Sequence, residues 1–258
     1  MNGLALCAGG MLGLEHSVKK TFPAYRTVCF VEGEAFAVQH LVKKMEEGRL
    51  DYAPIWSNLI TFDGKPWSGK VDIITSGFPC QPFSSLGKKL GEDDQRDLWP
   101  HVARIIGEVR PKLIFLENVP NIVNRRLDSI ILDLDKMGFN CSWCVIPASS
   151  VGAPHKRERW FLLGMSNANS LGRRKNQLNS QERKQLHPKR VGDEQREYVS
   201  THWQIEPSMD RLVDGASDWV DKLRLLGNGV VPQQAYSALQ ILGARLACGI
   251  VANREPKG

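Results

Sequence analysis

The sequence predicts an α/β fold built on a doubly wound, mostly parallel sheet. Short apolar runs of strand length alternate along the chain with longer segments whose apolar residues recur at helical spacing. Such alternation is typical of a sheet that helices cover on both faces. With 258 residues the chain is long enough for a large domain with a well-packed core and a smaller region beside it.

The expected strands are continuous apolar runs, as buried strands of a parallel sheet require. They cover residues 4–7, 27–32, 71–76, 112–119, 141–148 and 158–165. The expected helices begin or end at proline or glycine, the residues that punctuate helices. They cover residues 34–48, 97–110, 122–138 and 231–247, and a further helix is expected directly after the first glycines.

A polar segment interrupts this pattern at residues 166–205. Between Ser166 and His202, eight basic and four acidic side chains contribute +4 of the net charge of +6. A segment of this composition is a linker, a disordered insert or a module that orders on a polyanion. We therefore divide the chain into residues 1–165, a small irregular region at 166–208, and a segment at 209–258 that returns to the first part.

Several protein classes do not fit the composition. No apolar run approaches the roughly eighteen residues of a membrane span, and the N-terminus lacks the basic region of a secretory signal. We therefore expect a cytoplasmic protein with free thiols at its six cysteines. Cys141 and Cys144 form a lone C-x-x-C without a second pair, so we expect no metal site there.

The first strand is followed by Gly9 and Gly10 and then by a helical pattern. This arrangement brings backbone N–H groups close to a nucleotide-like ligand, although many glycine turns after strands are simply turns. Glu32, at the end of the next strand, is placed to bind ribose hydroxyls.

The strand at residues 71–76 runs into "GFPCQPFSS", where Cys80 stands between Pro79 and Pro82. Proline has no N–H to donate, so the strand ends there and presents Cys80 at its rim. A buried packing role is the alternative for this thiol, but its position favours a nucleophile. The polar, glycine-bearing residues 84–97 that follow are expected to form a mobile lid.

Two further motifs carry charged groups at strand ends. Glu117 ends an apolar strand, where partial desolvation raises the pKa of a carboxyl toward the range of a general acid. Arg157 and Arg159 stand at alternate positions of a strand start and therefore share a face, where they either clamp an anionic or carbonyl group or form a solvated charge run.

Together these motifs resemble the DNA cytosine C5-methyltransferases of prokaryotes and phages. "GFPCQPFS" is similar to the catalytic motif of that family, "ENV" to its glutamate motif, "RER" to its paired-arginine motif and "LGNGVVPQ" to its closing motif. The resemblance spans residues 4–164 and 209–247, and "PCQPFS" followed about forty residues later by "ENV" is its specific part.

The resemblance implies a Rossmann-like, S-adenosylmethionine-dependent fold and a covalent mechanism. Cys80 would attack C6 of a cytosine flipped out of double-stranded DNA, and Glu117 would hold and protonate N3. C5 would then accept the methyl group of S-adenosylmethionine, with Arg157 and Arg159 bracing the pocket. The implied cofactor-binding residues are Cys7, Ala8, Gly9, Gly10, Glu32, Asn58, Leu59, Pro79, Leu98, Asn228 and Val230.

The resemblance also implies partners. Residues 166–208 fall where the family keeps its target-recognition region, and the implied DNA-binding residues are Gln81, Ser84, Ser85, Lys88, Arg173, Arg174 and Lys175. We expect a monomer in a bacterial or phage-infected cell, with a cognate restriction endonuclease as a candidate partner. Three positions depart from the family pattern: the glycine loop is roughly two residues shorter, Asn58 replaces an aspartate and His155 a glutamine.

Other functions remain open at this stage. One is methylation of transfer RNA by the RNA-directed branch of the same family. The other class of RNA enzyme would have a second cysteine where this chain has Glu117. Another is a DNA-binding relative that has lost turnover, which the shortened glycine loop favours and the intact Cys80 and Glu117 oppose. A thiol hydrolase is least favoured, because no histidine is placed as a base for Cys80.

Overall fold

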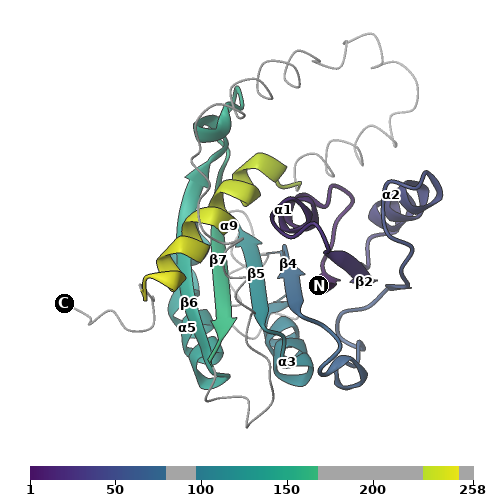
Figure 1. The fold of residues 1–258 in the computed structure, drawn as a ribbon, viewed down its shortest axis with the longest axis horizontal. Coiled ribbons are helices and arrows are strands. Elements are labelled where there is room, and N and C mark those ends of the chain that lie inside the picture. The colour runs from purple at the N-terminus through teal and green to yellow at the C-terminus, as the bar shows by residue number, and fades with distance from the viewer. Residues whose placement is uncertain (80–96, 168–228, 250–258) are drawn as a thin grey trace.

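A seven-stranded mixed sheet organises the described part of the chain (Figure 1). The computed structural model describes residues 1–79, 97–167 and 229–249. The strand order is β3-β2-β1-β4-β5-β7-β6. The strands are β1 (Asn2–Leu6), β2 (Arg26–Val31), β3 (Ile55–Trp56), β4 (Ile73–Ser76), β5 (Leu113–Asn118), β6 (Phe139–Pro147) and β7 (Glu158–Ser166).

The direction of the strands divides the sheet into two parts. From β3 to β5, every pair of neighbours is parallel, so these strands end at a common edge. Strand β7 lies between β5 and β6 and is antiparallel to both. The prediction of a doubly wound, mostly parallel sheet is confirmed, and the antiparallel part places the beginning of β7 beside the end of β5.

The helices follow the expected order with one break. They are α1 (Gly13–Thr21), α2 (Ala35–Glu46), α3 (Trp99–Val109), α4 (Ile122–Arg125), α5 (Leu127–Lys136) and α9 (Pro232–Ala247), with 3₁₀ turns η1 (Lys65–Trp67) and η3 (Ala148–Val151). The single helix expected at residues 122–138 is wrong, because Arg126 leaves helical geometry with φ −146° and ψ −4°. At this break the buried side chain of Arg126 forms an ion pair with Asp97.

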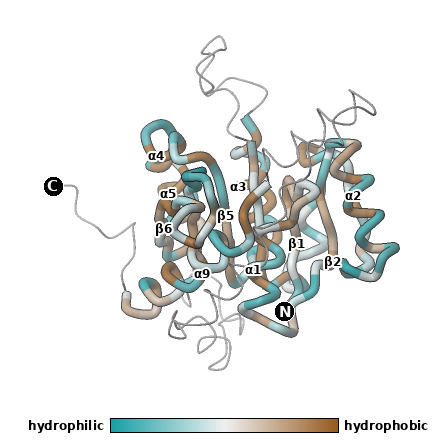
Figure 2. The backbone as a smooth tube through the Cα atoms, turned by 90° about the horizontal axis from the view of Figure 1, so that it is seen from above, coloured by the Kyte–Doolittle hydropathy of each residue, from teal (hydrophilic) through white to brown (hydrophobic). Residues whose placement is uncertain are grey.

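Helices cover both faces of the sheet, which explains why its strands are almost wholly apolar. On one face, α1 and α9 pack against each other and against the sheet; on the other, α3 and α5 pack on β1, β4 and β5 (Figure 1). Along α2, hydrophobic and hydrophilic segments alternate (Figure 2), because only Ala37, Leu41 and Met45 turn inward.

Helix α9 packs against the part of the chain formed by residues 1–165. Gln240 of this helix donates to Thr21 of α1, and Arg245 donates to the carbonyl oxygen of Trp143 in β6. The expected boundaries near residues 165 and 208 stay predictions, since residues 168–228 lie outside the described part.

We predict that Phe161→Ala lowers the free energy of unfolding by about 3–5 kcal/mol, because it opens a cavity in a close-packed core. Phe161 is fully buried and its ring stacks on Phe115 with centroids 5.9 Å apart. Urea denaturation measures the change. The control Leu132→Ala, at a side chain 53% exposed, should stay within about 0.5 kcal/mol. Equal losses in the two variants would contradict the assignment of the core.

Candidate active site

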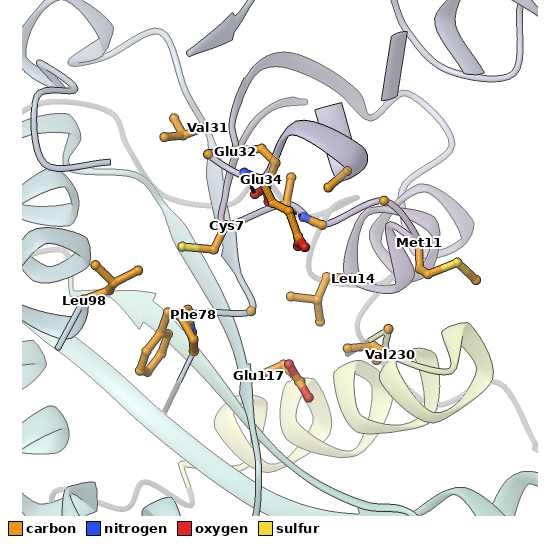
Figure 3. A pocket seen from close by; sticks show the side chains of 18 of the residues that line it. Cys7, Met11, Leu14, Val31, Glu32, Glu34, Phe78, Leu98, Glu117 and Val230 are labelled. Carbon is orange, nitrogen blue, oxygen red and sulfur yellow. Dashed lines mark hydrogen bonds between the residues drawn. The ribbon is translucent and has the colours of Figure 1, made fainter. Parts of the chain in front are cut away.

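A cavity of about 960 Å³ opens at the edge where the parallel strands end. Its walls come from the segments that follow β1, β2, β3 and β4, and from the end of β5. Ligands of doubly wound sheets bind outside the carboxyl ends of the strands, and this volume is that of a typical small-molecule site. In Figure 3, Glu32 and Val31 lie on one side of the cavity, and Glu117 and Val230 lie on the other.

The glycine loop is held by contacts from two other elements. The backbone N–H of Gly9 donates to Glu32 Oε2 over 2.8 Å, and the other carboxylate oxygen accepts from the N–H of Glu34, also over 2.8 Å. From α2, Lys44 Nζ donates to the carbonyl oxygen of Gly10 over 2.6 Å. Gly9 itself has φ +61°, a left-handed conformation that glycine adopts without strain.

The predicted cofactor-binding residues come together around this one cavity. Ten of them line it, and the eleventh, Asn228, lies outside the described residues. The ten are Cys7, Ala8, Gly9, Gly10, Glu32, Asn58, Leu59, Pro79, Leu98 and Val230. Burial raises the pKa of the Cys7 thiol to about 12, so this side chain meets the cavity as a neutral group.

Asn58 forms a local turn at the exposed end of the cavity. Its Oδ1 accepts a hydrogen bond of 2.9 Å from the backbone N–H of Ile60. The carboxamide therefore keeps its N–H₂ group and part of its Oδ1 capacity for a ligand, without carrying a charge.

Glu117 is a buried acid on the cavity wall with a raised pKa and an ion pair. The residue is only 6% exposed, and its Oε1 lies 2.8 Å from Nε of Arg159. Desolvation by burial raises the pKa of Glu117 to about 7, although Arg159 and, less strongly, Arg157 pull it down. A carboxyl with this pKa exchanges a proton near neutral pH, which suits a general acid or base.

The two predicted arginines are placed differently. Arg159 lines the cavity and pairs with Glu117. Arg157 is not among the residues that line the cavity, and its guanidinium donates to the carbonyl oxygen of Gly229 instead. The residue next to the glutamate also has a role, because Asn118 Nδ2 donates to the carbonyl oxygen of Phe78 over 2.9 Å and so fixes the chain after β4.

Sequence reasoning missed three polar residues around the site. Glu15 of α1 is buried on the cavity wall and accepts a 2.7 Å hydrogen bond from Thr75 of β4. Lys44 binds the glycine loop, and Gln234 is fully buried at the start of α9. The sequence offered a signal for Glu15 and Gln234, because each is a polar residue on the apolar face of a helix. Nothing in the sequence marks Lys44.

The remaining predicted residues lie outside the part of the chain that the structure describes. They are the catalytic Cys80 and the DNA-binding residues Gln81, Ser84, Ser85, Lys88, Arg173, Arg174 and Lys175. The chain reaches Cys80 directly from Pro79, which is described and lines the cavity.

Metal chemistry finds no support in the described residues. Cys141 and Cys144 belong to the core clusters on opposite faces of the sheet, so the two thiols of the C-x-x-C do not meet. Nowhere in residues 1–79, 97–167 and 229–249 do three metal-ligating side chains gather. None of the helices in these ranges is both long and apolar enough to cross a membrane.

A sheet of this strand order, with a glycine loop after β1 and a cavity at its carboxyl edge, has the Rossmann-like fold of the S-adenosylmethionine-dependent methyltransferases. Within that class, the chain belongs to the family of C-5 cytosine-specific DNA methylases, whose model matches residues 1–240.

Named relatives agree with this assignment. The Type II methyltransferase M.CviJI of Paramecium bursaria Chlorella virus IL3A is 32% identical over 158 residues, which are 60% of this chain and 41% of that protein. M.NgoMIV of Neisseria gonorrhoeae is 32% identical over 171 residues, 64% of this chain and 51% of that protein. The chain therefore spans about half the length of these curated relatives.

Solved structures support the fold alone, since their sequences are more distant. The crystal structure of the S. pombe Dnmt2 methyltransferase matches with a TM-score of 0.53 at 19% identity, covering 65% of this chain and 51% of that one. A Spodoptera frugiperda DNMT2 mutant also gives a TM-score of 0.53, at 24% identity, covering 67% of this chain and 53% of that one.

We predict that Arg159→Met raises the pKa of Glu117 further above about 7, because the variant removes the cation that favours the carboxylate. The carboxyl infrared band of Glu117, followed through a pH titration against a Glu117→Gln blank, measures the shift. The matched control is Arg104→Met, which removes an arginine paired with Glu108 outside the cavity. A pKa of Glu117 that is unchanged or lowered by Arg159→Met would contradict the electrostatic account.

Proposed function

We propose that this protein transfers a methyl group from S-adenosylmethionine to C5 of cytosine within a short specific sequence of double-stranded DNA. The observation that carries the proposal is the ion pair between Arg159 and the buried Glu117 on the wall of the cavity. An acid that titrates near neutrality, in a chain that also carries the Pro79–Cys80 motif, suits addition to a pyrimidine ring better than it suits the alternatives.

The residues of the cavity fit the proposed cofactor. The glycine-loop backbone and Glu32 are suited to the ribose, and Asn58 and Leu59 to the base at the exposed end. Gly13 and Val230 close the wall on the side of Glu117. When bound, S-adenosylmethionine supplies an electrophilic methyl group.

The protein's own groups perform the rest of the reaction. A cytosine leaves the DNA stack, since C6 cannot be reached inside it. The Cys80 thiolate forms a bond to C6 while Glu117 gives its proton to N3, which neutralises the electron pair entering the ring. C5 would accept the methyl group that the cofactor supplies, and the electron pair of the broken methyl–sulfur bond would stay on the departing sulfur. A base would then remove the C5 proton, the thiolate would leave C6 as the C5–C6 double bond returns, and N3 would give its proton back to Glu117.

Arg159 has a particular part in this scheme. It keeps Glu117 beside the cavity and moderates the effect of burial on its pKa, so that the carboxyl can both hold and release a proton near pH 7. Arg157 adds a second, weaker positive field at Glu117.

We predict that Cys80→Ala abolishes methyl transfer from labelled S-adenosylmethionine to unmethylated duplex DNA, because no covalent adduct can form at C6. Duplex binding should survive, as measured by fluorescence anisotropy. Bisulfite sequencing of the wild-type product should place the label on cytosines within one short sequence and so identify the target. Label on transfer RNA and not on DNA would redirect the proposal to the RNA branch, and loss of duplex binding in the variant would make Cys80 structural.

A second prediction concerns the basic segment at residues 166–208. Replacing Arg173, Arg174 and Lys175 together by glutamine should flatten the dependence of log Kd for DNA on log salt, by about 0.9 for each phosphate that the variant no longer neutralises. The matched control is a triple substitution by glutamine at Lys43, Lys65 and Lys70, which lie in the described part of the chain and outside the cavity lining. An unchanged slope would place the phosphate-binding residues elsewhere.

A further inference from the structure

The segment Gly229–Val231, by which the chain returns to the sheet before α9, forms part of the cavity wall. Gly229 and Val230 line the cavity, and Val230 lies against the beginning of α1. A Cβ added to Gly13 would come within 2.4 Å of the carbonyl oxygen of Val230 and 2.8 Å of its Cβ. The first residue of α1, which follows the glycine loop, and the return segment therefore touch with no space for a side chain between them.

The side chains of Arg157 and Gln234 hold this segment in place through hydrogen bonds, and we call these two residues the clasp. Gln234 is 0% exposed, and its Nε2 donates to the carbonyl oxygen of Arg157 over 2.9 Å and to that of Ile146. The guanidinium of Arg157 donates in turn to the carbonyl oxygen of Gly229. The clasp thus connects the first turn of α9, the start of β7 and the return segment.

The backbone of Arg157 adopts an unusual conformation within the clasp. Its φ of +26° is positive, which non-glycine residues seldom adopt. The next arginine, Arg159, lines the cavity and pairs with Glu117. The two arginines of one short motif thus make different contacts: Arg159 pairs with the acid, and Arg157 supports the segment of the wall that contains Gly229.

The clasp is separate from the packing that holds α9 in place. Ala235, Ala238, Leu239 and Leu242 of α9 are fully buried against α1 and the sheet. Loss of the clasp would therefore loosen the return segment while the apolar face of the helix stays docked.

We propose that Gln234 and Arg157 are positioning residues for the cofactor: they hold Gly229 and Val230 against the beginning of α1 and thereby set the affinity for S-adenosylmethionine. This inference rests on the proposed function, because it assumes that the cavity binds that cofactor. It assigns no contact with the cofactor to either side chain.

The test replaces Gln234 by methionine, which keeps the volume of the side chain but cannot donate to the two carbonyl oxygens. Isothermal titration with S-adenosylmethionine should show Kd raised about tenfold, the factor expected from losing roughly one net buried hydrogen bond. In the methyl-transfer assay KM for the cofactor should rise similarly while kcat at saturating cofactor stays unchanged. The matched control is Gln233→Met, at the neighbouring, partly exposed glutamine, which should leave Kd within about twofold.

A second measurement does not depend on catalysis. Amide hydrogen exchange of the peptide covering residues 229–235, in the ligand-free protein, should be faster in Gln234→Met than in Gln233→Met, because the return segment has lost its support. Arg157→Lys, which retains a donor toward Gly229, should exchange more slowly than Arg157→Met. Thermal denaturation establishes that each variant is folded.

The outcomes separate the inference from the function on which it rests. Wild-type protein that binds and transfers, with Gln234→Met equal to Gln233→Met in both Kd and exchange, overturns the clasp. Wild-type protein that binds no S-adenosylmethionine overturns the proposed function and, with it, the role of the clasp in cofactor affinity. Faster exchange together with a raised Kd in Gln234→Met, and normal values in Gln233→Met, supports the inference.

Discussion

The ion pair between Glu117 and Arg159 depends on one feature of the sheet, the reversed direction of β7. Glu117 stands near the end of β5 and Arg159 near the beginning of β7. Parallel strands would place these two positions at opposite edges of the sheet, whereas the antiparallel register brings Trp160 opposite Asn118 and so sets Arg159 beside the acid. The burial of Glu117 also has a thermodynamic consequence. The pKa of Glu117 in the fold, about 7, is above its ordinary value of 4.5, so the contribution of this group to stability is present below pH 4.5 and is lost as the pH rises through 7.

The shortened glycine loop, which raised the alternative of a relative without turnover, is supported by residues from outside the loop. The carboxylate of Glu32 accepts a hydrogen bond from the backbone N–H of Gly9, and Lys44 donates one to the carbonyl oxygen of Gly10. Because both contacts come from other elements of the fold, β2 and α2 fix the conformation that additional loop residues would otherwise have to fix. The cavity wall is therefore continuous from Cys7 to Leu14 despite the reduced length. This favours an intact binding function over a degenerate one.

Much of this architecture could be predicted from sequence because it follows from local patterns. The apolar runs predicted the strands of the parallel part except the two-residue β3, and the carboxyl-end rule predicted Gly9, Glu32 and Glu117 at one edge, where they line one cavity. The break in the helix at Arg126 could not be predicted in this way. The sequence of residues 122–138 has a continuous helical pattern, and the break occurs where Arg126 pairs with Asp97, a residue distant in the chain. Likewise, the contacts of Gln234 with Ile146 and Arg157 join segments far apart in the chain. Alternation of residues also placed Arg157 and Arg159 on one face, but it could not show that only Arg159 reaches the cavity.

The arrangement around β7 links the two halves of the proposed chemistry through a single short stretch of chain. Arg159 pairs with the acid that would hold the cytosine, and the carbonyl and guanidinium groups of Arg157 contact Gln234 and Gly229, beside the wall that would hold the cofactor. The backbone after Arg157 pairs with β6 from Glu158 onward and with β5 from Trp160 onward, so the start of β7 fixes the spacing of the two arginines. A methyl group can pass only when the acceptor carbon and the donor lie in line and close together. Under the proposed function, the start of β7 would position both substrates, which gives a physical reason for two arginines at alternate positions where one would suffice to pair with Glu117.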